Sequence, residues 1–353
     1  MSPAATKTET GNFFEDFRIG QEIRHATPRT VTEGDVALYM GLFGPRFAVQ
    51  SSDEFARSIG LPRSPLDDWL AFHIVFGKTV PDVSLNAVAN LGYANGVFGA
   101  PLYPGDTVTS TSTVIGLREN SSGKSGTVYV NSVGRNQRGE TVLDYVRWVM
   151  VNKRDPGAPA PEPVVPDLPD AVPADALVVP DGLDLSRYDD GLAGSAHRWG
   201  DYAVGERIDH VDGNTIEEAE HQIATRLYQN TARPHFNQHA ARDTRFGKRL
   251  IYGGHIISLA RALGFNGLAN AFKVAAINGG AHVAPTFAGD TVFAWTEVID
   301  KMEIPGRTDI GALRLRTVAA KDRPCADFPD KGADGKFDPA VVLDLDSTVL
   351  IPR

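Results

Sequence analysis

The 353-residue sequence has little cysteine, no excess of positive charge and no long apolar run. Its single cysteine, Cys325, excludes an intramolecular disulfide and any metal site built from several cysteines. The net charge of -9 argues against a general nucleic-acid binder and against binding to anionic membranes. No stretch is long enough to span a bilayer, and residues 1–11 lack the apolar core of a signal peptide. We therefore expect a cytoplasmic protein without nucleic-acid or membrane partners.

The second half of the chain repeats the first at a nearly constant offset. Residues 16–25 match residues 201–210 at an offset of 185 (201 − 16), and the same offset relates further blocks. The block at 100–108 matches the block at 284–292 with one residue lost. Agreement over several separate blocks indicates two copies of one structural unit in a single chain.

A proline-rich stretch separates the two copies. Prolines recur between residues 155 and 180, which prevents a packed helix or central strand and favours an extended path. We expect a tether that lies along the surface. The predicted organisation is an N-terminal unit at 12–154, a proline-rich linker at 155–197 and a C-terminal unit at 198–353.

The order of predicted elements is the same in both copies. Hydrophobic periodicity predicts two helices and then strands in each copy. In the first copy the helices cover residues 33–40 and 69–76, and the strands cover 106–115, 127–133 and 141–151. In the second copy the helices cover residues 217–228 and 255–263, and the strands cover 291–299, 312–319 and 340–351. This order favours an α+β fold, with an antiparallel sheet wrapped round a central helix, over a doubly wound sheet.

The two copies differ at residues suited to chemistry. His235 of the second copy corresponds to Gln50, and Gly253, at the start of an apolar helix, corresponds to Asp68. Histidine can move a proton in either direction near neutral pH, whereas glutamine cannot. A glycine N–H at a helix N-terminus allows a carbonyl oxygen to approach, and the helix dipole adds positive charge there. We predict one competent site per chain, with the first copy forming one wall of the cleft.

These residues resemble the MaoC-like enoyl-CoA hydratases, whose units adopt the hot-dog fold. In that family a motif of glycine, aspartate, any residue, asparagine, proline, an apolar residue and histidine precedes a Phe-Gly turn and a glycine at a helix start. His235 falls at the motif histidine, Phe246-Gly247 at the turn and Tyr252-Gly253 at the helix start. Because both halves are covered, the resemblance implies a double hot-dog. It also implies reversible hydration of an enoyl-CoA, with CoA as part of the substrate and no metal or other cofactor.

The chain departs from the family motif at the proton-transfer position. Asn230 stands where the family has a catalytic aspartate, and an amide cannot accept a proton at neutral pH. Two explanations stay open. Either Asn230 only orients the water while His235 performs both proton transfers, or a carboxylate elsewhere, with Asp67 and Asp68 as candidates, supplies the second base.

The other predicted site residues follow from the chemistry of an enoyl-CoA. The N–H of Gly253 is suited to stabilise charge on the thioester oxygen, and Tyr252 is expected beside it. Arg233 is suited to bind a free carboxylate on the acyl group through two parallel hydrogen bonds. The basic residues expected near the CoA phosphates are Arg242, Arg245, Lys248 and Arg249.

Other readings of the same residues stay open. A thioesterase shares the scaffold but normally activates water with a carboxylate, and loss of one site also fits a non-catalytic acyl-CoA binding protein.

Zinc is not predicted, because His235 and His239 have helical spacing but lack a third ligand. His25 and His210 recur at one repeat position, which favours a shared fold contact, and His282 is expected to face a ligand channel. Hot-dog units commonly associate, so the resemblance implies a homodimer.

Overall fold

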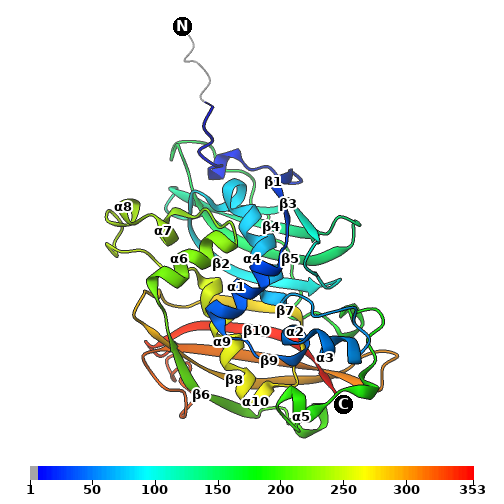
Figure 1. Ribbon diagram of the computed structural model, residues 1–353. Helices are drawn as coiled ribbons and strands as arrows, with labels where there is room; N and C mark the ends of the chain where they lie inside the picture. The colour runs from blue at the N-terminus through cyan, green and yellow to red at the C-terminus, as the bar shows by residue number, and fades with distance from the viewer. Residues whose placement is uncertain (1–6) are drawn as a thin grey trace.

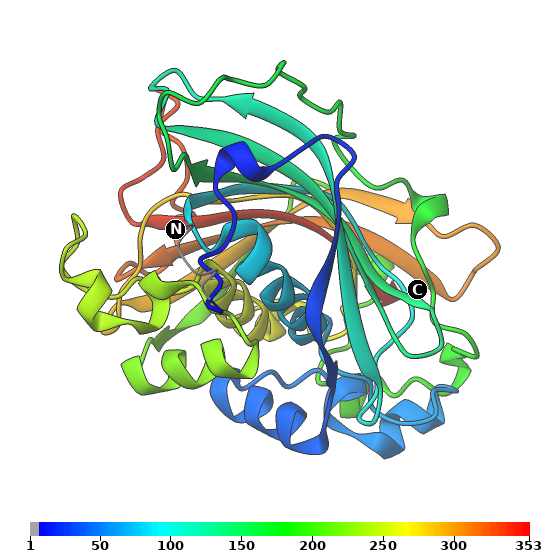
Figure 2. The same ribbon diagram turned by 90° about the horizontal axis from the view of Figure 1, so that it is seen from above.

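The computed structural model describes residues 7–353. Ten antiparallel strands form one continuous sheet in the order β1-β3-β4-β5-β2-β7-β10-β9-β8-β6. The sheet arches over two apolar helices, α4 (Asp68–Thr79) and α9 (Gly253–Leu263) (Figures 1 and 2). This arrangement confirms the predicted α+β class, with antiparallel strands around central helices.

Each copy contributes five strands, and both copies have the same strand order when read outward from the middle of the sheet. The strands are β1 (Glu22–Thr30), β2 (Ala87–Phe98), β3 (Thr107–Glu119), β4 (Ser125–Arg135), β5 (Thr141–Asn152), β6 (Arg207–Thr215), β7 (Lys273–His282), β8 (Thr291–Glu303), β9 (Ile310–Lys321) and β10 (Val341–Pro352). In the middle, β2 pairs with β7, and Tyr93 lies opposite Gly280. The two copies therefore share one sheet rather than merely touching.

The remaining helices are short or lie outside the sheet. They are α1 (Glu33–Phe43), α2 (Ala48–Ser51), α3 (Asp53–Ser58), α5 (Asp190–Ala193), α6 (Glu218–Leu227), α7 (Arg233–Phe236), α8 (Gln238–Ala241) and α10 (Phe265–Leu268), with a π-helical turn η2 (Val80–Ser84) and 3-10 turns η1 (Phe14–Asp16), η3 (Ala174–Ala176), η4 (Leu185–Arg187) and η5 (Trp199–Asp201). Helix α1 begins where the Thr32 side chain accepts the N–H of Asp35. No helix within residues 7–353 is both long and apolar enough to cross a membrane.

The centre of the fold is the pair of long helices. In α4 every residue from Trp69 to Thr79 is buried, because the sheet curves around this helix and α9 packs beside it. A helix that is apolar on all sides is suited to such a position. The N-terminus of α9 points from this core toward the segment that carries α7 and α8, and so the core fixes the helix start that the site uses.

The proline-rich stretch predicted to lie along the surface, residues 155–180, does so over most of its length, but Val172 and Leu177 within it are buried, and so are several residues of the linker that follows. Apolar residues such as Leu177, Leu183, Leu185 and Tyr188 are buried in a cluster with Ile59 of the first copy. The backbone N–H of Asp184 also donates to the carbonyl oxygen of Ile59 at 2.9 Å. Proline prevents regular secondary structure, but it does not prevent apolar neighbours from packing.

Candidate active site

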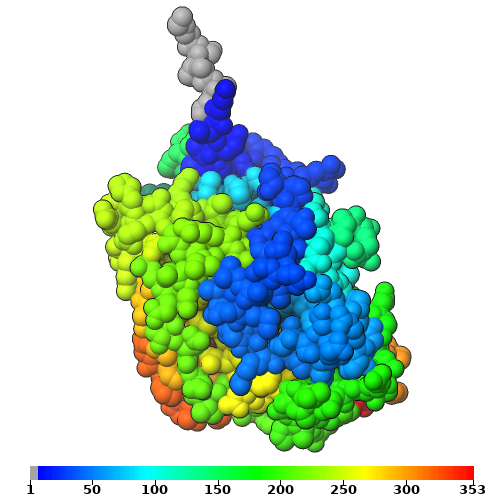
Figure 3. Space-filling model, viewed as in Figure 1, coloured from blue at the N-terminus to red at the C-terminus, as the bar shows by residue number. Residues whose placement is uncertain are grey.

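A cavity of about 710 Å³ lies between the two copies. The second copy contributes the segment from Asn230 to the start of α9 and the end of β7, while the first contributes α4, η2, β2 and β5. In Figure 3 the yellow-green segment that carries α7 and α8 forms a projecting edge of the molecule. The lining residues with polar or titratable groups suited to catalysis are Asn230, His235, Tyr252, Gly253, His282, Tyr93 and Arg147.

His235 is held on the short helix α7, which begins with an Arg-Pro pair. The His235 Nδ1 lies 3.1 Å from the carbonyl oxygen of Leu250. Because a carbonyl only accepts, Nδ1 carries the proton and Nε2 carries the free lone pair. Burial lowers the pKa of His235 to about 4. The imidazole is therefore neutral at pH 7 and can act as a base.

Gly253 is the first residue of α9, and the helix has no side-chain cap. The first N–H groups of a helix have no acceptor inside that helix, so they are available to a ligand. A Cβ atom at Gly253 would overlap the ring of His282, which packs directly against this glycine. The preceding N–H of Tyr252 donates to Nε2 of His221 at 2.8 Å and fixes the entry to the helix.

Asn230 is buried and lines the cavity next to α7. Its Oδ1 accepts the N–H of Ala232 at 3.0 Å, and its own N–H donates to the carbonyl oxygen of Thr225 at 2.9 Å. The first bond fixes the side chain, and the second, made by the backbone N–H, fixes the main chain in the wall that also carries His235. The amide can orient a water molecule by hydrogen bonding, but it cannot accept a proton near neutral pH.

The two carboxylates considered as a second base lie elsewhere. Asp67 caps α4 by accepting the N–H of Trp69 at 2.8 Å, and burial raises its pKa to about 6. Asp68 accepts from Lys273 Nζ at 2.9 Å and from the N–H of Val274 at 2.8 Å. Neither is among the described residues that line the cavity.

His282 lines the cavity, as the sequence suggested, and Tyr93 beside it was not anticipated. The His282 Nε2 lies 3.2 Å from the Tyr93 hydroxyl. Burial, followed by the nearby His235, lowers the pKa of His282 to about 4. Among the described residues that line the cavity, His235 and His282 are therefore the two whose side chains ordinarily titrate near neutral pH. Within residues 7–353, no group of three or more His, Cys, Asp or Glu side chains is placed to hold a metal ion.

Two of the four basic residues expected near the CoA phosphates line the cavity. They are Arg245, stacked on Phe246 at 4.5 Å, and Lys248, 4.0 Å from the ring centre of Phe287. Both are exposed, so their charges lie at the mouth.

The other two basic residues do not line the cavity. Arg249 forms an ion pair with Glu218 at 2.5 Å, and Arg242 is exposed. Arg233 is also exposed and outside the described lining. Its position does not support the predicted binding of an acyl carboxylate beside His235, because the neighbouring Ala232, Pro234 and His235 line the cavity while Arg233 does not.

The equivalent cleft of the first copy is filled by the linker. The cavity residues Ala241, Thr244 and Phe246 correspond to Ala56, Ile59 and Leu61 through the offset of 185 (241 − 56). All three counterparts are buried in one cluster with the apolar residues of the linker. At the first-copy helix start, Asp68 binds Lys273. The first copy therefore has neither the open cleft nor the free helix start of the second.

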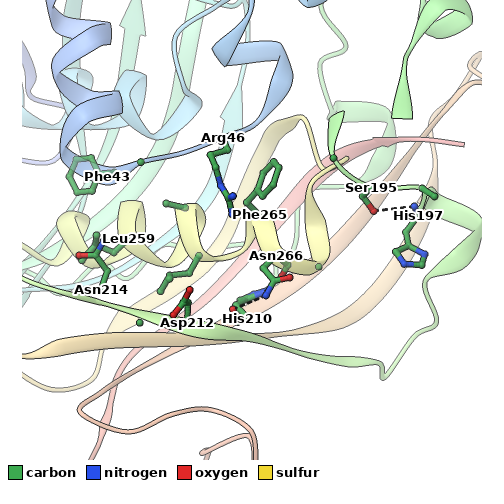
Figure 4. A pocket seen from close by; sticks show the side chains of 17 residues that line it. Phe43, Arg46, Ser195, His197, His210, Asp212, Asn214, Leu259, Phe265 and Asn266 are labelled. Carbon is green, nitrogen blue, oxygen red and sulfur yellow. Dashed lines mark hydrogen bonds between the residues drawn. The ribbon is translucent and has the colours of Figure 1, made fainter. Parts of the chain in front are cut away.

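A second hollow, of about 700 Å³, lies beside α10 and contains none of the predicted site residues. Figure 4 shows His210 beside Asn266 there. The His210 Nδ1 lies 2.7 Å from the Asn266 carbonyl oxygen, and its Nε2 lies 2.8 Å from the Thr296 hydroxyl. The repeat partner His25 likewise bonds through both nitrogens, to Asp82 and Ser112. The prediction of a shared fold contact is confirmed.

Comparison with solved structures defines the class of protein. A Mycobacterium tuberculosis protein with a double hotdog fold is 22% identical and superposes with a TM-score of 0.77, covering 98% of this chain and 99% of that one. The crystal structure of a MaoC domain protein from Chloroflexus aurantiacus is 68% identical, with a TM-score of 0.97 over 99% of both chains. The fold is a double hot-dog of the MaoC-like class, as the resemblance implied.

The chain belongs to the mesaconyl-CoA hydratase family, whose model matches residues 2–327. It is 68% identical over 349 residues to a β-methylmalyl-CoA dehydratase of Chloroflexus aurantiacus, with 99% of each chain covered. It is 60% identical to a mesaconyl-CoA hydratase of Cereibacter sphaeroides, covering 98% of this chain and 100% of that one.

Proposed function

We propose that this protein catalyses the reversible addition of water to mesaconyl-CoA, giving β-methylmalyl-CoA. The observation that carries the proposal is the neutral imidazole of His235, which shares one cavity with the uncapped glycine start of α9. The two relatives described above are named for the two directions of this one reaction.

The site supplies a base and a charge-stabilising donor. In hydration, the oxygen of water adds to the β-carbon while negative charge develops on the thioester oxygen. The N–H of Gly253 is suited to bind that oxygen, and a donor of this kind contributes about 3–4 kcal/mol. His235 takes a proton from water through Nε2, and a proton is then delivered to the α-carbon, which completes the addition of H and OH.

Asn230 has the supporting role in this scheme. With no carboxylate among the described lining residues, His235 performs both proton transfers and Asn230 orients the water. His282 packs on Gly253 and covers one side of the helix start. Tyr252, between His235 and Phe76, fixes the wall of the acyl pocket through ring contacts of 5.6 Å on each side.

The mouth of the cavity is suited to the CoA part of the substrate. Arg245 and Lys248 present positive charge there, although the chain as a whole is negative. Each charge attracts phosphate without determining which acyl group is accepted. CoA therefore enters as part of the substrate, and the acyl end reaches the imidazole.

An assay that follows two products separates the candidate functions. Purified protein is incubated with mesaconyl-CoA while the enoyl absorbance and free thiol are recorded. Hydration predicts loss of absorbance without thiol release. Thiol release would show a thioesterase, and binding without any turnover would show a non-catalytic acyl-CoA binding protein. Either result contradicts the proposal.

The assembly and the location are proposed with the function. We infer a homodimer of double hot-dogs, because hot-dog units commonly associate. Light scattering of the purified protein should then give twice the chain mass of 38.0 kDa. The cytoplasmic location stays a prediction from the sequence, and cell fractionation tests it.

A further inference from the structure

Arg147 on β5 is a fully buried arginine that lines the same cavity. Its Nη2 donates to the Thr79 hydroxyl at 2.8 Å and to the Ser84 hydroxyl at 3.3 Å, while Nη1 lies 3.4 Å from Asn90 Oδ1. The buried Nε atom has no partner among the described residues. All of these acceptors are neutral, so the side chain has unused donors and an unbalanced charge.

A buried arginine without a carboxylate is unfavourable, because the guanidinium stays ionised in proteins. Burial lowers the pKa of Arg147, and the groups that raise it are the tyrosines Tyr145, Tyr93 and Tyr252. Two buried lysines pair with carboxylates, Lys153 with Glu119 at 2.7 Å and Lys273 with Asp68 at 2.9 Å. A third buried lysine, Lys78, donates to the carbonyl oxygen of Thr27. An anion that enters the cavity supplies the missing acceptors and balances the charge of Arg147.

The position of Arg147 connects it to the reacting end of the cavity. Its guanidinium carbon lies 4.3 Å from the centre of the Phe76 ring. Phe76 packs against Tyr252, and Tyr252 packs against His235, each with ring centres 5.6 Å apart. Arg147 and His235 thus line one pocket, linked through Phe76 and Tyr252, and they come from different copies.

The arginine is present in one copy only. On β5 it lies opposite Val130, and at the equivalent place on β10 Ser347 lies opposite Leu315. Val130 and Leu315 are equivalent because they pair with Val114 and Val298, which the offset of 184 relates after the lost residue (298 − 114). Because a strand partner defines the register, Ser347 is the counterpart of Arg147. The first copy therefore supplies an arginine to the open cleft, while the filled cleft has none.

We propose that Arg147 binds the free carboxylate of the substrate's acyl group and so selects dicarboxylic CoA thioesters over neutral enoyl-CoAs. The inference rests on the proposed function and assigns to Arg147 the role that the sequence suggested for Arg233. The unused donors on Nε and Nη1 of this planar guanidinium are held in a fixed geometry in which they can bind carboxylate oxygens, which a lysine cannot reproduce. Arg147 is a specificity-determining residue in this account, and proton transfer stays with His235.

The test compares mesaconyl-CoA with crotonyl-CoA, which lacks the carboxylate. The ratio of their kcat/KM values is measured for wild type, Arg147→Met and Arg147→Lys. We expect the ratio to fall about 100-fold in Arg147→Met and at least about 10-fold in Arg147→Lys, with crotonyl-CoA turnover changed little. Ser347→Ala is the matched control at the counterpart position, and its ratio should equal that of wild type.

A binding measurement separates this inference from the proposed function. The dissociation constants of succinyl-CoA and butyryl-CoA, which differ in one carboxylate and contain no double bond, are compared by calorimetry. Wild type should prefer succinyl-CoA, and Arg147→Met should lose that preference even if no hydratase activity exists. The melting temperature of Arg147→Met should hold or rise, because an unpaired buried charge has been removed.

Equal loss for both substrates in a folded Arg147→Met protein would mean a purely structural role and would overturn the inference. If Arg147→Met does not fold, Arg147→Lys decides. An unchanged ratio in that variant overturns the inference, and a reduced ratio supports it.

Discussion

The Nδ1–H of His235 donates to the carbonyl oxygen of Leu250 across 3.1 Å, and this bond determines which nitrogen of the ring is free. Leu250 is held in turn, because its N–H donates to the carbonyl oxygen of Pro234 at 3.0 Å. The loop before α9 and the helix α7 thus fix one another. The result is an imidazole whose Nε2 keeps its lone pair for a substrate water.

The pKa of His235 predicts the pH dependence of the reaction. Burial lowers this pKa from its ordinary value to about 4, so the base form is present at neutral pH and is lost only as the pH falls through about 4. We expect kcat/KM to be constant between pH 8 and about pH 6 and to decline toward pH 4. Brief exposure to each pH after storage at pH 7 separates this effect from unfolding. A decline already complete at pH 6 would contradict the assignment.

Gly253→Ala tests the helix start. A Cβ atom at this position overlaps the ring of His282, so the ring or the helix must shift away from the substrate oxygen. We expect kcat/KM to fall by about 100-fold or more, on the scale of losing one oxyanion donor. Gly41→Ala on α1 is the control, since nothing lies within 4 Å of its Cβ. That variant should be fully active and slightly more stable. Normal activity in Gly253→Ala would remove the helix start from the mechanism.

The cations at the mouth should affect binding rather than chemistry. We expect Arg245→Gln and Lys248→Gln each to raise KM several-fold while kcat changes little, because the two cations are proposed to bind only the CoA part. The effect should shrink as ionic strength rises. Arg242→Gln changes an equally exposed arginine outside the cavity and serves as the control. A similar KM increase in all three variants would indicate a general charge effect.

The linker should contribute stability through the filled cleft. Leu185 is buried in the cluster that occupies the first copy's cleft, whereas Leu192, seven residues on, is 74% exposed. Leu185→Ala should lower the free energy of unfolding by about 2–5 kcal/mol, and Leu192→Ala by much less. Urea denaturation measures both. Equal stability of the two variants would show that the linker only connects the copies.

The repeat offset predicted much of the fold, because it related two helices and three strands of one copy to those of the other. The strands that the sequence analysis missed are β1, β2, β6 and β7. Two of them, β2 and β7, join the copies and are rich in alanine, glycine and asparagine, which have weak strand propensity. Their pairing is determined by contacts distant in sequence, so local patterns could not reveal it.

Only the part of the candidate site that is local in sequence was predicted, because contacts between distant residues leave no local pattern. His235, Asn230, Tyr252 and Gly253 lie close together in the chain, and their joint position in the cavity follows the motif. Arg147 belongs to the other copy, and in the sequence it is one more charged residue of a strand. Only the pairing of β2 with β7 and the curvature of the sheet bring it to the cavity. The choice of Arg233 relied on nearness in sequence, which does not determine the direction of a side chain.

The most direct test of the central claim is the rate of mesaconyl-CoA hydration by His235→Gln, which installs the residue found at position 50 of the first copy. His239→Gln is the matched control, because His239 is exposed and only four residues away. The account predicts that His235→Gln stays folded and loses about 1000-fold or more in kcat/KM, while His239→Gln matches wild type. A His235→Gln protein that hydrates mesaconyl-CoA at a rate near that of wild type would contradict the account.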